Sequence, residues 1–222
     1  MKIQNIFDSE LNIQDISNKE EVIPSKETVS FGIHGIKGSF THMSLLKFLK
    51  LIGINESNVK PVYLVEAKRV LDAVLNGEVD RGVIAVANSG SGVYVSSMKV
   101  MAENIFQIPA IYGMPVNQCL IVHPSIEDKS QIKQIFGHPK AIEQCARTLE
   151  SDYPDVEVVK GEDSDDTALC VQRIAEGDLP KTTATLASSL AAELYGMKIL
   201  RSNMQHDPYN HTSFLVIKRV KD

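Results

Sequence analysis

Arg81-Gly82-Val83-Ile84-Ala85-Val86-Ala87-Asn88-Ser89-Gly90-Ser91-Gly92 is the stretch that decides the fold. The apolar run after Arg81 predicts a strand that is buried on both faces, as in a parallel or mixed sheet. The small residues from Asn88 to Gly92 predict a loop at the end of this strand, leading into a helix over residues 93–103. Ligands of open α/β sheets bind beyond the carboxyl ends of strands, so this loop is a candidate binding loop. Its Asn and Ser side chains can hold a carboxylate or a hydroxyl, although a flexible turn explains them equally well.

Strand and helix patterns alternate on both sides of this stretch. Thr41 is the expected N-cap of one predicted helix, and Gly77 ends another. The alternation predicts an α/β fold with a parallel or mixed sheet, and so many strands favour two lobes over one compact sheet. Residues 109–115 look like a crossover between the lobes. The predicted strands are 28–33, 62–65, 81–87, 119–122, 156–159, 183–187 and 213–217, and the predicted helices are 41–51, 67–76, 93–103, 139–151, 165–176 and 189–195.

Composition excludes several classes of protein. The chain has 222 residues, 43% of them hydrophobic, and a formal net charge of -5, so we expect neither nucleic acid nor a membrane as a partner. Its three cysteines form no CxxC pair, which argues against a zinc site or a disulfide framework and favours a reducing cytoplasm. No signal peptide or long apolar span is evident. Residues 1–28 are charged and weakly periodic, and we interpret them as an N-terminal arm.

Three further loops carry candidate site residues. In Gly35 to His42, backbone N–H groups and the Ser39 hydroxyl can face an anion at a helix N-terminus, whereas an ordinary capped loop is the alternative. Thr212 offers a hydroxyl just before the last strand, with His211 on the opposite face, but most strand threonines are structural. His138 is either a ligand or acid–base group, or a capping or solvated residue. The residues alone therefore indicate a two-lobed α/β protein that binds a small polar molecule.

Taken together and in order, these segments resemble the catalytic domain of the prephenate dehydratase family over about residues 29–218. The match is carried by the order and spacing of several modest motifs. They are Gly35 to His42, which is similar to Gly-x-x-Gly-(Ser/Thr)-(Phe/Tyr)-Ser; Gly77 to Asp80 with Val83 to Gly92, similar to a stretch ending in Pro-Ile-Glu-Asn-Ser; Gly137 to Ala141 with Gln144-Cys145, similar to Ser-His-Pro-Gln and its Gln-Cys helix; Asp166-Thr167-Ala168, similar to Ser-Thr-x-x-Ala; Thr185 to Ser188 through Leu200; and Asn210 to Phe214, similar to Asn-x-Thr-Arg-Phe.

The resemblance implies a fold. It is α/β and two-lobed, like type II periplasmic binding proteins, with mixed sheets and a cleft between the lobes that holds the active site. The catalytic domain would be residues 29–222. One lobe would combine about 29–104 with 201–222, and the other would be about 105–200. We expect the catalytic domain only, with no ACT regulatory domain and no fused chorismate mutase.

The resemblance also implies chemistry. Dehydratases of this family convert prephenate to phenylpyruvate in phenylalanine biosynthesis, losing CO2 and the C4 hydroxyl, with no metal or organic cofactor. Thr212 would assist proton delivery to that hydroxyl as the catalytic residue. The partner would be the prephenate dianion, and the assembly a homodimer or homotetramer. The residues expected to bind substrate are Ser39, Asn88, Ser89, Gly90, His138, Thr167 and Phe214.

The sequence departs from the family pattern at three positions. Ser213 stands where the Arg after the motif Thr is usual, Ala87 where the Glu before Asn-Ser is usual, and Ala85 where a Pro is usual. Losing one charge-assisted hydrogen bond typically costs about 1.5–3 kcal/mol, so we expect these changes to weaken the site. Two other functions therefore stay open: a non-aromatising prephenate decarboxylase that retains the hydroxyl, and a non-catalytic small-molecule binding protein.

Overall fold

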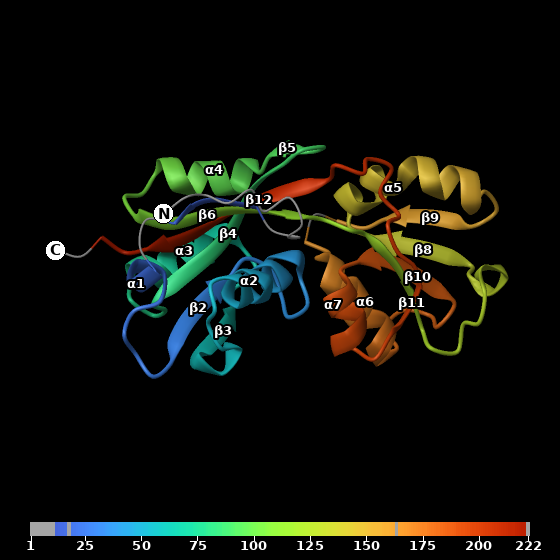
Figure 1. The fold of residues 1–222 in the computed structure, drawn as a ribbon. Coiled ribbons are helices and arrows are strands. Elements are labelled where there is room, and N and C mark those ends of the chain that lie inside the picture. Colours follow the sequence, from blue (N-terminus) through green and yellow to red (C-terminus); the bar gives the residue numbers. More distant parts are fainter. Residues whose placement is uncertain (1–11, 17–18, 163, 221–222) are drawn as a thin grey trace. The chain divides into compact units, whose positions relative to one another are not determined.

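The computed structural model describes residues 12–16, 19–162 and 164–220 (Figure 1). The chain divides into two compact units, each described here by itself. The first takes the described residues of Met1–Gly35, Ser44–Pro115 and His211–Asp222, and the second takes those of Ile36–Met43 and Val116–Asn210.

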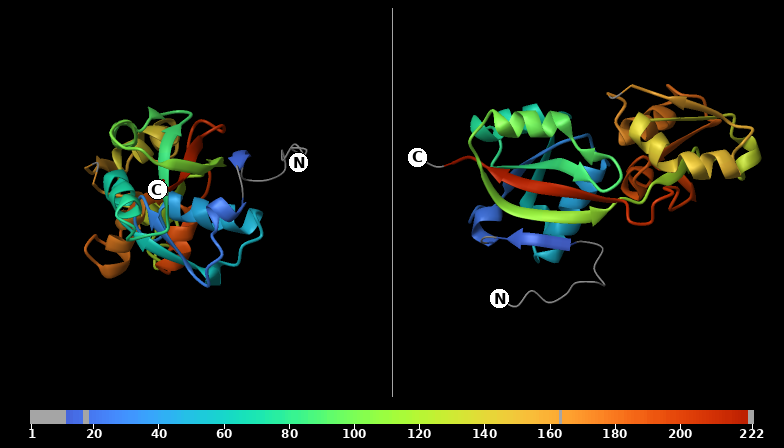
Figure 2. Two further views of the ribbon diagram at one scale, coloured as in Figure 1. Left: turned by 90° about the vertical axis from the view of Figure 1, so that its left-hand side faces the viewer. Right: turned by 90° about the horizontal axis from the view of Figure 1, so that it is seen from above.

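The first unit is built on a mixed sheet. Parallel pairing joins β2 to both β3 and β4, while β12 pairs antiparallel with β4 and with β6. The C-terminal strand, red in Figure 1, therefore lies inside the sheet, and β6 runs beside it in the right-hand view of Figure 2. The strand order is β1 (Asn12–Ile16), β6 (Gln107–Pro115), β12 (His211–Lys218), β4 (Arg81–Asn88), β2 (Val29–Ile33) and β3 (Val59–Tyr63), and β5 (Gly92–Val93) pairs with β4.

Helices cover both faces of this sheet. On one face, α3 (Ala67–Leu75) and α4 (Val95–Ala102) enclose a core that includes Ile84 and Leu215. On the other, Phe48 of α2 (Phe40–Leu51) stacks on Tyr112 with ring centroids 4.4 Å apart, and Tyr112 lies 5.5 Å from Phe214. Burying both faces explains why β4 has an almost unbroken apolar sequence. The short elements are α1 (Lys19–Val22) and the 3-10 helix η1 (Glu56–Asn58).

The second unit is a smaller mixed sheet with helices on both sides. β8 pairs parallel with β9 and β10, whereas β7 pairs antiparallel with β10 and β11. Cys145 and Leu149 of α5 (Pro139–Asp152) pack on one face; Val171 of α6 (Thr167–Glu176) and Ala191 of α7 (Ser189–Leu194) pack on the other. The strand order is β11 (Lys198–Arg201), β7 (Cys119–Val122), β10 (Thr183–Ala187), β8 (Gln134–Gly137) and β9 (Glu157–Lys160), and η2 (Lys129–Gln131) is a 3-10 helix.

The α/β class with mixed sheets is confirmed, but the boundaries lie elsewhere than expected. Residues 105–115 belong to the first unit because β6 pairs with β12 and β1, so the expected crossover at 109–115 is a strand. Residues 201–210 and 36–43 belong to the second unit. Of the expected N-terminal arm over 1–28, residues 1–11 and 17–18 lie outside the described residues, Asn12–Ile16 is an edge strand of the first sheet, and Lys19–Val22 is a short helix.

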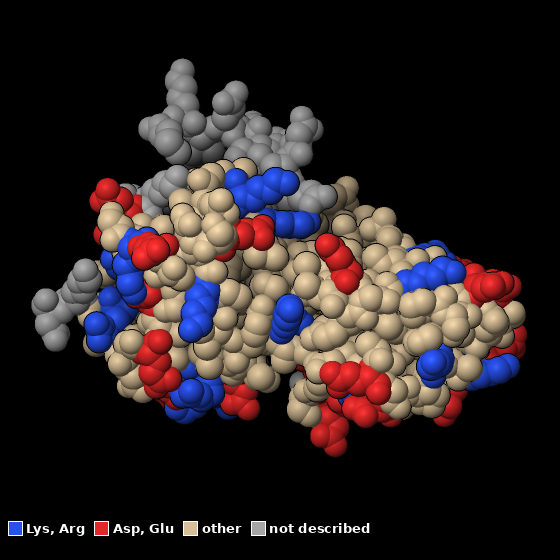
Figure 3. Space-filling model, turned by 90° about the horizontal axis from the view of Figure 1, so that it is seen from below, with Lys and Arg blue, Asp and Glu red and all other residues tan. Residues whose placement is uncertain are grey.

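Charged side chains are dispersed on one face of the molecule. On the face that Figure 3 shows, Lys and Arg side chains lie between acidic and uncharged residues, without one broad basic area. Within the described ranges 12–16, 19–162 and 164–220, no helix has the length and apolar character that crossing a membrane requires.

Candidate functional site

Thr212 and Asn88 form the centre of the candidate site in the first unit. They pair across β12 and β4, and Asn88 Nδ2 donates a hydrogen bond of 3.0 Å to Thr212 Oγ1. The amide is oriented by its other end, because Asn88 Oδ1 accepts the N–H groups of Gly90 (2.9 Å) and Ser91 (3.0 Å). Both side chains are buried. The loop after β4 is thus an ordered turn built on the asparagine.

Ser89 joins the same loop to the start of β12. Its N–H donates to the carbonyl of His211 (2.8 Å), and its Oγ accepts the N–H of His211 (2.9 Å). Ser89 and Gly90 are exposed. The first bond continues the backbone pairing of β4 and β12 past Asn88, and the second adds a side-chain acceptor, so together they fix the strand end that carries Thr212.

The two charged residues that this chain lacks would have faced the other side of the sheet. Ala87 and Ser213 are cross-strand partners, both half-buried, next to the Asn88–Thr212 pair. Successive side chains of a strand point to opposite faces. Ser213 therefore shares its face with Leu215, which packs toward α3 and α4. Ala87 and Ser213 thus lie on the face of the sheet opposite to the one that carries Asn88 and Thr212.

Phe214 lies in the core. Its ring is fully buried and faces Tyr112, whose hydroxyl is 3.1 Å from Ser44 Oγ. Burial raises the pKa of Tyr112 and the Ser44 hydrogen bond opposes this, so the phenol stays neutral. Because the ring has no exposed surface, the structure does not place Phe214 where substrate was expected to touch it. Its packing against Tyr112 instead supports the face of β12 on which Thr212 lies.

In the second unit, helix N-termini gather at one edge of the sheet. Parallel strands β8, β9 and β10 end at the same edge, and helices follow them. Ser188 Oγ accepts the N–H of Ala191 (3.0 Å) at the start of α7. Asp166 Oδ1 accepts that of Ala168 (2.8 Å) at α6, so Thr167 is the first helical residue there. The partial positive charge of helix N-termini favours an anion at such an edge.

His138 is a capping residue. Its Nδ1 accepts the N–H of Lys140 at 3.1 Å, at the start of α5, and the side chain is half-buried. The capping alternative for His138 is therefore confirmed. Because Nδ1 accepts this bond, Nε2 is the ring nitrogen left to donate to another group. Burial raises the pKa of nearby Asp166, and two backbone N–H bonds and His138 oppose that shift.

Ser39 is the N-cap of α2, where Thr41 was expected as the cap. Ser39 Oγ accepts the N–H of His42 (3.2 Å), which is the N-cap geometry. The preceding Gly38 has φ +89°, and a Cβ there would lie 3.1 Å from Ala191 Cα. Only glycine fits this close approach, so the Gly-rich loop is specific in its geometry.

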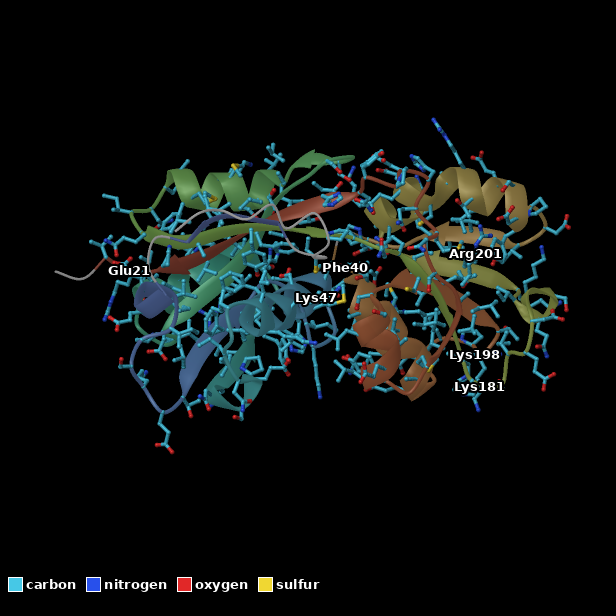
Figure 4. The ribbon with its side chains drawn as sticks, in the orientation of Figure 1. Glu21, Phe40, Lys47, Lys181, Lys198 and Arg201 are labelled. Atoms are coloured by element: carbon cyan, nitrogen blue, oxygen red, sulfur yellow. The ribbon has the colours of Figure 1, made fainter. Side chains whose placement is uncertain are left out.

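Several cations of the second unit are engaged elsewhere. Figure 4 shows Lys198 and Arg201 on β11 and labels Lys181 near them. Lys198 Nζ donates to the carbonyls of Ile126 (2.9 Å) and Glu127 (3.4 Å), and Arg201 pairs with Asp152. Lys198 and Arg201 therefore link segments of the second unit to one another.

Sequence reasoning missed His42. The pattern gave it no role, although it stands three residues after the Ser39 cap and is buried. Its Nδ1 accepts the N–H of Gly38 (3.1 Å). A histidine close behind a Gly-Ser turn is the signal that would have revealed it.

Comparisons with known proteins place these features in one family. A family model described as prephenate dehydratase matches residues 31–222. The bifunctional chorismate mutase/prephenate dehydratase of Enterobacter agglomerans is 24% identical over 214 residues, covering 96% of this chain and 53% of that protein. Arogenate dehydratase 1 of Petunia hybrida is 34% identical over 140 residues, covering 63% of this chain and 32% of that protein. The chain thus spans about half the length of the first relative, and its match covers about a third of the second.

A solved structure shares the fold. The prephenate dehydratase of Arthrobacter aurescens, in complex with L-Phe, superposes with a TM-score of 0.75 at 23% identity, covering 87% of this chain and 61% of that chain. The motifs, their order and the family match over almost all of the described chain agree. The chain therefore belongs to the prephenate dehydratase family.

Proposed function

We propose that the protein is a lyase that converts prephenate to phenylpyruvate, with Thr212 as the group that donates to the departing hydroxyl. The observation that carries this proposal is the hydrogen bond from Asn88 Nδ2 to Thr212 Oγ1. An amide N–H can only donate, so Thr212 Oγ1 accepts this bond. The hydroxyl hydrogen of Thr212 is then directed away from Asn88 and is available to a second oxygen.

The proposed reaction needs one proton donor from the protein. The bond from the ring to its carboxylate breaks and releases CO2, and the electron pair enters the ring. The C4–O bond breaks at the same time, and the hydroxyl leaves as water with the proton that Thr212 delivers. A proton from water restores the Thr212 hydroxyl. The electron pair left by CO2 replaces the pair that departs with the hydroxyl, so no step needs a redox partner, and aromatisation drives the reaction. A positioned general acid typically contributes about 10²- to 10⁴-fold in rate.

The departures at Ala87 and Ser213 fit this proposal because they leave the Thr212 face unchanged. The polar groups of the second unit, Ser39, Thr167 and His138, remain proposed substrate-binding residues. What supports them is their place at or beside helix N-termini, which favour carboxylates.

The deciding experiment is product identification. Purified protein incubated with prephenate should yield phenylpyruvate, identified by its ultraviolet spectrum and mass, well above the uncatalysed background. Thr212→Val replaces the hydroxyl with a methyl group and should lower kcat by about 100-fold or more, whereas Thr212→Ser keeps a hydroxyl and should stay within about tenfold. Ser213→Ala, next in sequence but on the other face, is the matched control and should match the parent.

Other results would point elsewhere. A dihydro-hydroxyphenylpyruvate product would identify the non-aromatising decarboxylase, and tight prephenate binding without turnover would identify the binding protein. Several relatives are named arogenate dehydratases, so L-arogenate belongs in the same assay as a second substrate. A Thr212→Val variant that turns over at the parent rate would refute the assigned acid.

We further propose a cytoplasmic enzyme that assembles as a dimer or tetramer. Support for the compartment comes from Cys119, Cys145 and Cys170, which are all free and buried. Support for assembly comes from strongly exposed apolar side chains near α4, Val95 at 60% and Ile105 at 83%. Sedimentation equilibrium measures the assembly: a monomer at micromolar concentration contradicts it.

A further inference from the structure

The turn before α2 is held by a dense set of hydrogen bonds within the second unit. Tyr195 Oη donates to the carbonyl of Lys37 (3.1 Å), and Ser188 Oγ donates to that of Gly38 (2.6 Å). The N–H of Gly38 donates to His42 Nδ1 (3.1 Å). Gly38 also packs closely against α7, so that a Cβ at this position would lie 3.1 Å from Ala191 Cα. Both polar groups of the Gly38 backbone are thus fixed by side chains.

The His42 side chain closes a loop of bonds around Ser39. The backbone N–H of His42 donates to Ser39 Oγ (3.2 Å), and the Met43 N–H donates to the Ser39 carbonyl (2.9 Å). Because Ser39 Oγ accepts from the backbone, its hydrogen can be donated to another oxygen. The direction of that hydroxyl depends on the Gly38–Ser39 turn, which the imidazole holds from one side.

The imidazole can do this only as a neutral ring. An Nδ1 that accepts a backbone N–H has no proton of its own, so the proton is on Nε2. Burial, with the charge of Lys37 as a smaller cause, lowers the pKa of His42 to about 4. One tautomer is therefore maintained throughout the neutral range.

We propose that His42 is a positioning residue that acts through Gly38 to set the Ser39 hydroxyl for an anionic oxygen of the substrate. The inference rests on the proposed function, in which Ser39 binds a carboxylate. His42 itself need not touch the substrate. Its Nδ1 replaces water or a second backbone group as the acceptor for the Gly38 N–H, and this keeps the turn in its left-handed form.

Two substitutions separate this role from mere space-filling. Asn at position 42 can put its Oδ1 where Nδ1 lies and still accept the Gly38 N–H. Gln is equally polar, but its extra methylene carries the oxygen past that position. We expect His42→Gln to raise the KM for prephenate by about fivefold with little change in kcat, as the loss of one hydrogen bond implies, and His42→Asn to stay within about twofold.

A second histidine provides the matched control. His123 also accepts a backbone N–H at Nδ1, from Ser125 at 3.1 Å, but on a surface turn of the same unit. His123→Gln and His123→Asn should both behave as the parent. Equal KM values for the Gln and Asn variants at position 42 would overturn the proposal.

A readout that needs no turnover keeps this inference separate from the dehydratase assignment. In nitrogen NMR, the His42 ring should show the Nε2–H tautomer without titration from about pH 8 to about pH 5.5, as a pKa of about 4 requires. Amide exchange at Gly38 should accelerate several-fold in His42→Gln and return to the parent rate in His42→Asn. If the parent protein forms no phenylpyruvate, the proposed function fails, while unchanged Gly38 exchange in His42→Gln would refute the role of His42.

Discussion

Ala87 and Ser213 stand opposite each other on β4 and β12, one position along from the Asn88–Thr212 pair. The two positions where the family usually has Glu and Arg are therefore cross-strand neighbours on one face. Opposite charges at such positions attract, and a single charge there has no partner. Two small side chains thus stand opposite each other where the family pattern leads us to expect a charged pair.

Restoring these charges tests that coupling. Ala87→Glu or Ser213→Arg alone should lower the free energy of unfolding by about 1–3 kcal/mol, because each leaves a half-buried charge unpaired. The double variant should recover about 0.5–1 kcal/mol of the summed loss, and kcat should change little in all three. Urea denaturation and prephenate turnover measure both effects. Strictly additive losses, or a tenfold gain in kcat/KM from Ser213→Arg alone, would contradict the pairing.

Asn88→Asp should impair catalysis while preserving the turn. A carboxylate oxygen can still accept the N–H groups of Gly90 and Ser91, but the other oxygen now faces Thr212 Oγ1 as an acceptor. Thr212 would then donate its hydrogen to the introduced carboxylate, and we expect kcat to fall by about 10- to 100-fold. Steady-state kinetics provide the measurement.

Asn55→Asp is the control for that substitution. Asn55 also accepts a nearby backbone N–H, from Ser57, on an exposed turn of the first unit. Its kinetics should equal those of the parent. An Asn88→Asp enzyme with full activity would mean that the amide does not direct the Thr212 proton.

Gly38→Ala should destabilise the protein by about 2–4 kcal/mol, since the new Cβ is both strained at φ +89° and 3.1 Å from the Ala191 backbone. Gly53→Ala is the comparison: φ is +71° there, but nothing lies within 4 Å of the added atom. That change should cost about 1 kcal/mol, from the backbone conformation alone. Equal losses of unfolding free energy in the two variants would argue against the close approach.

Stability should fall as the pH drops from about 6.5 toward 4. Burial lowers the pKa of both His34 and His42 from 6.5 to about 4, so in this range the unfolded chain binds protons that the folded chain does not. Above about pH 6.5 both states are neutral and the effect vanishes. Asp166, whose pKa burial raises, works in the opposite direction.

The pH effect can be assigned to one residue. Urea midpoints measured from about pH 7.5 to about pH 4.5 should decline in the parent and decline less in His42→Asn, which cannot titrate. Parallel curves for the two proteins would show that His42 is protonated equally well in the folded state.

Much of the fold could be predicted from local patterns. The apolar runs of β4, β7 and β10 and the periodicity of α3 and α5 are strong signals, and their elements lie within a few residues of the predicted bounds. β6 was missed because Pro109, Gly113 and Pro115 suggest a loop, and only its pairing with β12 makes it a strand. β1 depends on the same kind of tertiary partner.

The candidate site, like the fold, could be predicted only in part. Its residue types and order were evident in the sequence, so Thr212, Asn88 and Ser89 could be selected in advance. Which face each side chain takes was not evident, because the bulge between the 213–87 and 214–85 pairs alters the register of β4. The burial of Phe214 depends on its contact with Tyr112, which is distant in sequence. The bond between His42 and Gly38 depends on a turn that residue propensities do not specify.

The position of β12 between β6 and β4 has a consequence for biosynthesis. Residues 211–218 leave the ribosome after every residue of the second unit. The second unit can therefore fold while the first sheet still lacks the strand between β6 and β4. Until β12 is in place, the facing edges of β6 and β4 stay exposed and can pair with other nascent chains. The segment that carries Thr212 is thus also the last described strand of the first unit to be made, so we expect a chain that stalls before it to lack the proposed acid and to aggregate.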